Sequence, residues 1–184
     1  NSEMVFGSIN FRETKTDGLD KLAFRAYKEI LSFLDRIEFP FLARCWNYFP
    51  DINLESNGIE RYKLFCSGRH EAFLKKYQSM HGYLPAASAV GSQSGPLTIN
   101  FIAARNCTGE HIENPRQVSA YKYPTSYGEH SPSFARATYI DWGESKYLYI
   151  AGTASIIGHK SCHIDNPLLQ LQETQENLDS LLNH

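Results

Sequence analysis

Three residues with metal-ligating side chains lie close together near the end of the chain, at His159, Cys162 and His163. A zinc site in a protein needs three or four such ligands in tetrahedral geometry. The sequence contains no second cluster of Cys and His residues that could complete the set. We therefore expect no metal site, and no other motif requires a cofactor.

Nucleophilic catalysis by a serine or a cysteine has little support in the sequence. The G-x-S-x-G elbow of Ser/His/Asp hydrolases does not occur. The cysteines, at positions 45, 66, 107 and 162, are widely spaced and form no C-x-x-C pair, which is typical of free thiols in a cytoplasmic protein. Cys66 falls on the apolar side of an expected helix, where a cysteine more often packs as a small hydrophobe than acts as a nucleophile.

Length and composition indicate a globular chain. The 184 residues predict one large domain or two small ones, at roughly 100–200 residues per domain. Apolar residues make up 42% and charged residues 21%, which excludes intrinsic disorder. No apolar run approaches the roughly 20 residues of a membrane span. The 18 basic and 20 acidic residues nearly balance, so we expect neither nucleic acid nor a membrane as a partner.

The elements that must position these side chains follow from hydrophobic periodicity. Apolar residues recur at three- and four-residue steps in residues 20–37, 58–77 and 168–182, which predicts three helices. Short apolar runs bounded by Gly, Pro, Ser and Asn predict strands, and the turn at residues 142–144 predicts a hairpin. The expected strands are residues 4–11, 41–49, 87–91, 97–104, 116–123, 134–141 and 146–151. This order predicts an α+β fold, a mixed sheet with helices packed on one face.

One comparison within the chain suggests a repeated unit. Residues 6–34 and 151–182 each contain a strand end, a loop with glycine and a helix that ends in leucines. An incomplete second unit would leave an apolar helix face at Leu171, Leu178 and Leu182 without strands of its own. We expect this face to pack on the first unit or on a neighbouring chain.

Five separated blocks of sequence resemble a known family. They are residues 46–53 (WNYFPDIN), 60–69 (ERYKLFCSGR), 113–121 (ENPRQVSAY), 131–138 (SPSFARAT) and 152–159 (GTASIIGH). Together they are similar to the chorismatase family, which comprises chorismate hydrolases and hydroxybenzoate-forming enzymes and is often labelled pteridine-dependent dioxygenase-like. Because the blocks are spread over most of the chain, the match is more specific than one short motif.

The resemblance also implies a fold and a domain organisation. The family is similar to the trimeric YjgF/RidA-like deaminases, a fold also described as chorismate-mutase-like. Residues 4–110 then correspond to a nearly complete first copy, and residues 111–184 to the strands and helix that open a second one. The chain resembles a piece of such a protein, similar to its C-terminal half. The resemblance further implies a homo-oligomer, such as a trimer, or a pseudo-oligomer within one chain.

Hydrolysis of the enolpyruvyl ether of chorismate gives a hydroxybenzoate, or a dihydroxycyclohexadiene acid, plus pyruvate. This reaction needs cationic groups for two carboxylates and a general acid for the ether's terminal methylene. Arginine suits the carboxylates because its planar fork binds them bidentately. The resemblance implies a substrate-binding set of Arg69, Arg116, Lys122, Tyr123, Tyr127, Arg136, Ser155 and Cys66. The expected partner is a small aromatic or cyclohexadienyl carboxylate.

This chain departs from the family pattern at the position expected for the general acid. The family usually has Glu directly after the block at residues 152–159, and here the residue is Lys160. With an ordinary pKa of about 10.4, lysine is a weaker acid than a glutamic acid whose pKa is raised. Lys160 and Glu173 are therefore the catalytic candidates. The substitution at Lys160 and the anionic Glu129 leave an alternative open, a non-catalytic protein that binds an aromatic acid or a partner. An imine-hydrolysing role is not expected, because Ala87 occupies the position of the deaminases' arginine.

Overall fold

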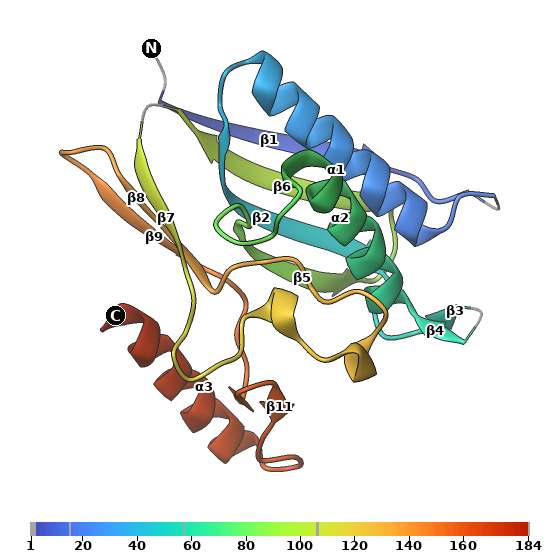
Figure 1. Ribbon diagram of the computed structural model, residues 1–184. Helices are drawn as coiled ribbons and strands as arrows, with labels where there is room; N and C mark the ends of the chain where they lie inside the picture. Colours follow the sequence, from blue (N-terminus) through green and yellow to red (C-terminus); the bar gives the residue numbers. More distant parts are fainter. Residues whose placement is uncertain (1–2, 15, 57, 106, 184) are drawn as a thin grey trace.

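A four-stranded sheet forms the centre of the chain. The computed structural model describes residues 3–14, 16–56, 58–105 and 107–183. The strands lie in the order β1 (Met4–Phe11), β6 (Leu97–Ala104), β2 (Phe41–Pro50) and β5 (Ala86–Ser92) (Figure 1). The first three pair antiparallel, and β5 pairs parallel to β2. The sheet is mixed, and the predicted α+β class is confirmed.

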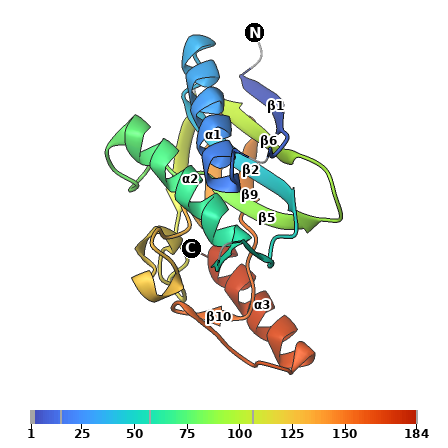
Figure 2. The same cartoon turned by 90° about the vertical axis from the view of Figure 1, so that its right-hand side faces the viewer.

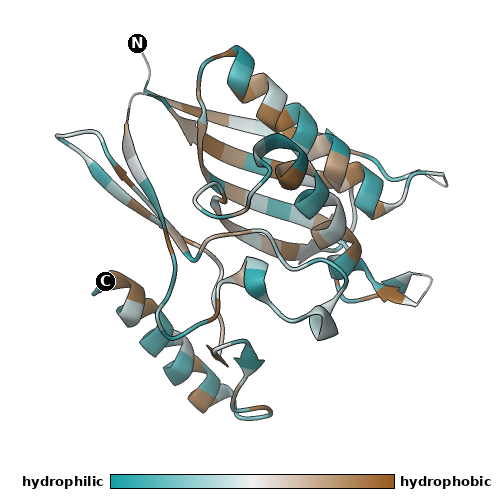
Figure 3. Cartoon of the chain, viewed as in Figure 1, coloured by the Kyte–Doolittle hydropathy of each residue, from teal (hydrophilic) through white to brown (hydrophobic). Residues whose placement is uncertain are grey.

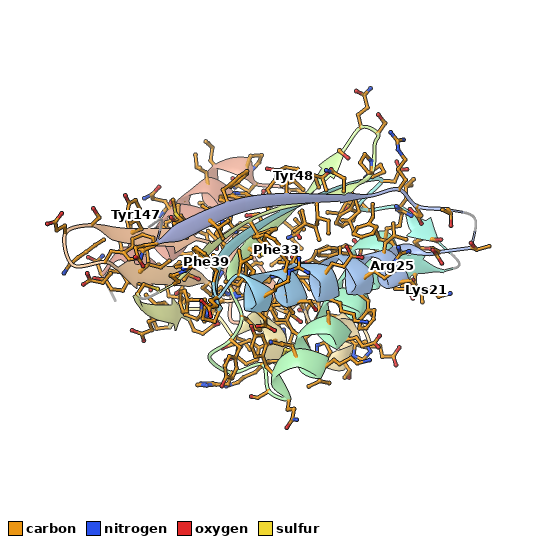
Figure 4. All side chains as sticks on the ribbon, turned by 90° about the horizontal axis from the view of Figure 1, so that it is seen from above. Lys21, Arg25, Phe33, Phe39, Tyr48 and Tyr147 are labelled. Carbon is orange, nitrogen blue, oxygen red and sulfur yellow. The ribbon has the colours of Figure 1, made fainter. Side chains whose placement is uncertain are left out.

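Two helices cover one face of this sheet, α1 (Leu19–Arg36) and α2 (Arg61–Tyr77). Both helices lie on the same side of the strands, and Tyr48 lies on the other side (Figures 2 and 4). The buried side of α1 follows the helical period and consists of Leu19, Leu22, Ala23, Ala26, Tyr27, Ile30, Leu31 and Leu34. None of the helices in the described ranges is long and apolar enough to cross a membrane.

A second, three-stranded sheet follows in the chain. It consists of β7 (Thr108–Ile112), β8 (Ala137–Asp141) and β9 (Lys146–Ile150), all antiparallel. The predicted β8–β9 hairpin is confirmed, whereas the sequence analysis missed β7. Two short pairs complete the strands, β3 (Glu55–Ser56) with β4 (Ile59–Glu60) and β10 (Ile156–Ile157) with β11 (Lys160–Ser161). Because β4 occupies residues 59–60, α2 begins later than predicted.

The strand predicted at residues 116–123 is wrong. Only Gln117 makes a bridge there, to Gly158, and a 3-10 helix (Ala120–Lys122) follows. Val118 N–H donates to the carbonyl of Gly158 at 2.8 Å, and Gly158 N–H donates to the carbonyl of Arg116 at 2.9 Å. Pairing ends after these two bonds, because the Val118 carbonyl instead accepts from the guanidinium of Arg136.

The last helix, α3 (Pro167–Leu182), packs through its polar side. Its N-terminus is capped by the Asn166 side chain, which accepts from Leu169 N–H at 3.2 Å. Glu173, Asn177 and Leu181 are its buried residues. Leu171 is 67% and Leu182 62% exposed, so these leucines do not pack on the first unit as expected; apolar and polar residues alternate along α3 (Figure 3). Packing on a neighbouring chain stays a prediction.

His111 lies at the junction between the two sheets, and we expect it to make the stability of the folded chain depend on pH. The Thr138 hydroxyl oxygen accepts from Ala86 N–H at 3.0 Å and lies within hydrogen-bonding distance of Nδ1 of His111, at 3.1 Å. The His111 ring stacks on Phe41 with centroids 4.8 Å apart. Burial lowers the pKa of His111 from 6.5 to about 4, which means that the folded state holds the ring neutral.

Stability from His111 is therefore fully present above pH 6.5 and is lost as the pH falls from 6.5 through about 4. The expected loss of unfolding free energy is about 3 kcal/mol. Urea unfolding across this range should show a smaller pH dependence in His111→Gln than in wild type. Replacement of the exposed His81 by Gln should leave the wild-type slope unchanged. Equal slopes in wild type and His111→Gln would contradict the prediction.

Candidate functional site

A cavity of about 520 Å³ lies between α2, the outer edge of β5 and two later segments of the chain. One segment, residues 123–136, follows the 3-10 helix Ala120–Lys122, contains a second one (Thr125–Tyr127) and then runs beside β5 (Figure 1). The other, residues 152–156, follows β9. Five of the residues that the sequence proposed line this cavity: Cys66, Arg69, Tyr123, Tyr127 and Arg136.

Arg69 is a buried cation with unused hydrogen-bond donors. It lies on the inner side of α2, only 3% exposed, and lines the cavity. Its guanidinium carbon lies 4.8 Å from the ring centre of Tyr27 and 5.4 Å from that of Phe73. Its Nε and Nη2 atoms are buried without a partner in the described part of the chain. A buried guanidinium in this state is costly unless a ligand supplies an acceptor.

Arg136 is the second buried cation of the cavity, at 3% exposure. Its Nη2 donates to the Val118 carbonyl and to the Tyr123 hydroxyl, each at 2.9 Å. The guanidinium also lies 5.2 Å from the ring centre of Phe134. Its Nε is buried without a partner among the residues the structure describes. Tyr123 is thus fixed through its hydroxyl, with its ring against the cavity.

A third buried guanidinium lies behind the cavity, on β2. Arg44 is 6% exposed and donates from Nη2 to the Ser88 hydroxyl oxygen at 2.6 Å. Burial lowers the pKa of Arg44, and the charge of Arg69 adds to this effect. Ser88 lines the cavity.

None of these three guanidinium groups has a carboxylate oxygen within 4 Å in the described ranges. The carboxyl group of Glu113 is the acid whose charge interacts with Arg136. Burial raises the pKa of Glu113 to about 7, although Arg136 opposes the shift. Glu113 is therefore partly protonated near neutral pH and does not fully balance Arg136. The walls of the cavity carry an excess of positive charge that suits an anionic ligand.

The remaining cavity residues are mainly aromatic or apolar. Burial raises the pKa of Cys66 to about 12, so the residue is a neutral thiol and not a nucleophilic thiolate. Tyr127 lies at the rim, 40% exposed, and its hydroxyl donates to the carbonyl of His159 at 2.8 Å. The rings of Tyr123 and Tyr127 have their centres 5.5 Å apart. Such a wall offers an apolar surface to a six-membered carbon ring.

Two of the proposed residues, Arg116 and Glu173, pair with each other away from the cavity. The Arg116 guanidinium contacts Glu173 and also lies 3.1 Å from a carboxylate oxygen of Glu176. Nε2 of His163 lies 3.6 Å from the other oxygen of Glu173. This cluster fastens α3 to the segment before the cavity, and neither Arg116 nor Glu173 lines the cavity.

The other three proposed residues also lie outside the cavity lining. Ser155 is buried, and its hydroxyl donates to the Cys162 carbonyl at 2.9 Å. Lys160 is exposed on β11. The Lys122 ammonium lies 5.7 Å from the ring centre of Tyr121. The structure therefore brings five of the ten proposed residues together and leaves five apart.

Asn177 attaches α3 to the rest of the chain, and we expect its replacement to weaken this attachment strongly. Its side chain is fully buried, donates to the carbonyls of Ala154 and Ile156 at 3.0 Å each, and accepts from Nε of Arg116 at 3.1 Å. Asn177→Ala removes all three bonds and leaves Nε of Arg116 without this acceptor, which should cost about 2–4 kcal/mol. The two carbonyls keep their other donors, Ile156 N–H and the Gln117 side chain. Hydrogen exchange of the α3 amides should rise accordingly. Gln175→Ala, on the exposed side of the same helix, should change exchange little; similar rates in both variants would contradict the prediction.

Sequence reasoning missed Arg44, Ser88 and Ser133. Ser133 is buried, lines the cavity and has a hydroxyl without a partner in the described part of the molecule. Arg44 did carry a signal, because it is the one charged residue in the run FLARCWNYF. The two serines gave no such signal, because neither a serine within a short strand nor one in a loop indicates a ligand contact by itself.

Residues 1–103 match the family profile described as "Chorismatase FkbO/Hyg5-like, N-terminal". The chain belongs to the chorismatase family. A 3-hydroxybenzoate synthase from Streptomyces hygroscopicus is 36% identical over 162 residues, which cover 85% of this chain and 47% of that protein. A chorismatase from Streptomyces rapamycinicus is 36% identical over 155 residues, covering 83% of this chain and 46% of that protein.

A chorismatase crystal structure has a similar fold, with a TM-score of 0.89 and 32% sequence identity. The similarity covers 98% of this chain and 56% of the other. The chain therefore spans about half the length of the chorismatase-family proteins that it matches. The matched profile describes the N-terminal domain, so the expected likeness to a C-terminal half is wrong.

Proposed function

We propose that the protein to which this chain belongs hydrolyses the enolpyruvyl ether of chorismate or a close analogue. Hydrolysis consumes one water and gives pyruvate and a dihydroxycyclohexadiene acid. A hydroxybenzoate forms instead where the ring also loses one water, so that no water is consumed overall. Relatives at 36–37% identity carry the names 3-hydroxybenzoate synthase and chorismatase, which supports this proposal. We also propose that the cavity between α2, β5 and residues 123–136 holds the substrate.

One observation carries this assignment: the cavity combines buried, unpaired guanidinium nitrogens with aromatic walls. Nε and Nη2 of Arg69 and Nε of Arg136 lack acceptors among the described residues. A ligand carboxylate would satisfy them through charge-assisted hydrogen bonds. Tyr123 and Tyr127 would lie against the ring, and Cys66 would contribute apolar surface. A cyclohexadienyl dicarboxylate has both the charge and the ring that these walls require.

The catalytic roles of Lys160 and Glu173, and the binding roles of Arg116, Lys122 and Ser155, stay predictions. None of the five lines the cavity as it stands. We propose that a residue of this group can contact substrate in the cavity only if it moves from the position described here. Lys160 is the easiest to test, because it is exposed and forms no ion pair in the described part of the chain.

We further propose that the fold is YjgF/RidA-like, with residues 4–110 as one copy and residues 111–184 as the opening of a second. The β7–β8–β9 sheet followed by α3 supports a second unit. The cavity lies between residues of both proposed units, as expected for an assembly of such copies within one chain or between chains. A cytoplasmic location is part of the same proposal.

The test uses the full-length protein with chorismate and follows pyruvate release. We expect pyruvate together with a hydroxybenzoate or a dihydroxycyclohexadiene acid. Lys160→Glu should raise the rate if position 160 supplies the acid. Calorimetric binding of chorismate without turnover would contradict hydrolysis and leave a binding protein. An absence of both binding and pyruvate would contradict the assignment of the cavity as well.

A further inference from the structure

The buried Arg44 and the partly buried Ser88 form a pair that links the middle of the sheet to the cavity wall. They lie on neighbouring parallel strands, where Arg44 is in register with Ala86 and Ser88 with Trp46. Nη2 of Arg44 donates to the Ser88 oxygen at 2.6 Å, and Nη1 donates to the Cys45 carbonyl at 3.1 Å. The guanidinium carbon lies 4.9 Å from the Trp46 ring centre. The cation is thus fixed by the sheet and directed at one serine.

The backbone of Ser88 is fixed by a second contact, from the buried Asn47. The Asn47 side chain donates to the Ser88 carbonyl at 2.8 Å and accepts from the Tyr27 hydroxyl at 2.6 Å. Asn47 and Tyr27 are both fully buried. Two residues of β2, Arg44 and Asn47, therefore hold the side chain and the main chain of Ser88. Fixed positions of this kind are typical of groups that orient a ligand.

The hydroxyl proton of Ser88 has no hydrogen-bond acceptor in the described part of the chain. Because its oxygen accepts from Arg44, its hydroxyl proton is free to be donated elsewhere. No acceptor for that proton lies in hydrogen-bonding geometry in the described part of the chain. A Cβ atom at Gly152 would lie 3.1 Å from the Ser88 oxygen, so glycine keeps this part of the cavity open. A hydroxyl that accepts from a cation is also a stronger donor to an anion.

We propose that Ser88 donates a hydrogen bond to a carboxylate of the bound substrate and that Arg44 is a positioning residue that acts through Ser88. This inference rests on the proposed function, and it assigns one carboxylate of the substrate to the β5 side of the cavity. Arg69 and Arg136 remain available to the other carboxylate. The cation of Arg44 stays behind the serine and strengthens its hydrogen bond without contacting the substrate.

The experiment uses the full-length protein and measures KM and kcat with chorismate, and Kd with 3-hydroxybenzoate by calorimetry. Ser88→Ala should raise KM and Kd about 10-fold and change kcat less. Ser88→Thr keeps the hydroxyl and should restore most of the affinity. Ser92→Ala is the matched control, because Ser92 lies on the same strand outside the cavity lining, and it should behave as wild type.

A double-mutant cycle tests the role of Arg44. Arg44→Met alone should weaken binding in the same direction as Ser88→Ala, and it should add little when Ser88 is already alanine. Additive losses would overturn the positioning role, and a Ser88→Ala variant with wild-type KM and Kd in an active enzyme would overturn this inference alone. A wild-type protein that neither binds 3-hydroxybenzoate nor releases pyruvate would overturn the proposed function and, with it, this inference.

Discussion

Arg69→Met in the full-length protein is expected to lower kcat/KM for chorismate at least about 100-fold, because each charge-assisted hydrogen bond lost costs about 1.5–3 kcal/mol. Arg69 is only 3% exposed, and two of its nitrogens have no partner among the described residues. In the bound state we expect these nitrogens to pair with a carboxylate of the substrate. Steady-state pyruvate release measures the change.

The same substitution should leave the ligand-free protein about as stable as wild type. Methionine fills a similar volume and removes a buried, unpaired charge, which is stabilising. The lost contacts with the rings of Tyr27 and Phe73 offset this gain by about 0.5–2 kcal/mol. We therefore expect the unfolding free energy to change by less than about 1 kcal/mol. Urea unfolding without ligand provides this value.

The matched control is Lys75→Met, which removes the same charge from an exposed position of the same helix. It should keep kcat/KM within about twofold of wild type, as is usual for surface substitutions. Wild-type kcat/KM in Arg69→Met would contradict the role of Arg69 as a carboxylate ligand. A loss of activity matched by an equal loss of stability would instead indicate a structural role.

The sequence predicted α1, β1 and β6 because each of them buries one regular face. The buried residues of α1 follow the helical period along its whole length, so no knowledge of the rest of the fold is needed. Residues 116–123 have no regular buried face that would reveal their structure. Two main-chain bonds to Gly158 and one bond from Arg136 determine their path instead. Those partners lie far along the chain, so the pattern of apolar and polar residues within 116–123 could not predict them.

The residues of the candidate site also fall into those that the sequence could indicate and those that it could not. Arg69 was proposed from the resemblance of residues 60–69 to the family, and the structure places it on the buried side of α2, where a charge needs a reason to be buried. Arg116 could not be judged from its own surroundings in the sequence. Its partners, Glu173 and Glu176, come from a helix that folds back about sixty positions later. Arg44 and Ser88 are 44 positions apart and meet only because β2 and β5 pair.

Gly68→Ala is expected to destabilise the protein by about 3 kcal/mol or more, although alanine is the better helix former by about 1 kcal/mol. Gly68 lies in α2 where that helix meets α1. A Cβ atom there would lie 1.9 Å from the Asp20 carbonyl oxygen and 2.9 Å from the Phe24 amide nitrogen. Both atoms belong to the backbone of α1, so a side-chain rotation cannot relieve the overlap. The helices must move apart.

Chemical unfolding of Gly68→Ala beside Ser67→Ala measures this effect. Ser67 precedes Gly68 in the same helix and its side chain is partly exposed, so its replacement should change stability by less than about 0.5 kcal/mol. Separation of the helices should also displace Arg69 from the Tyr27 ring of α1, which lies 4.8 Å away. We therefore expect Gly68→Ala to raise the KM for chorismate as well. A variant as stable as wild type would mean that α1 and α2 do not cross in close contact, and that the position of Arg69 depends on other residues.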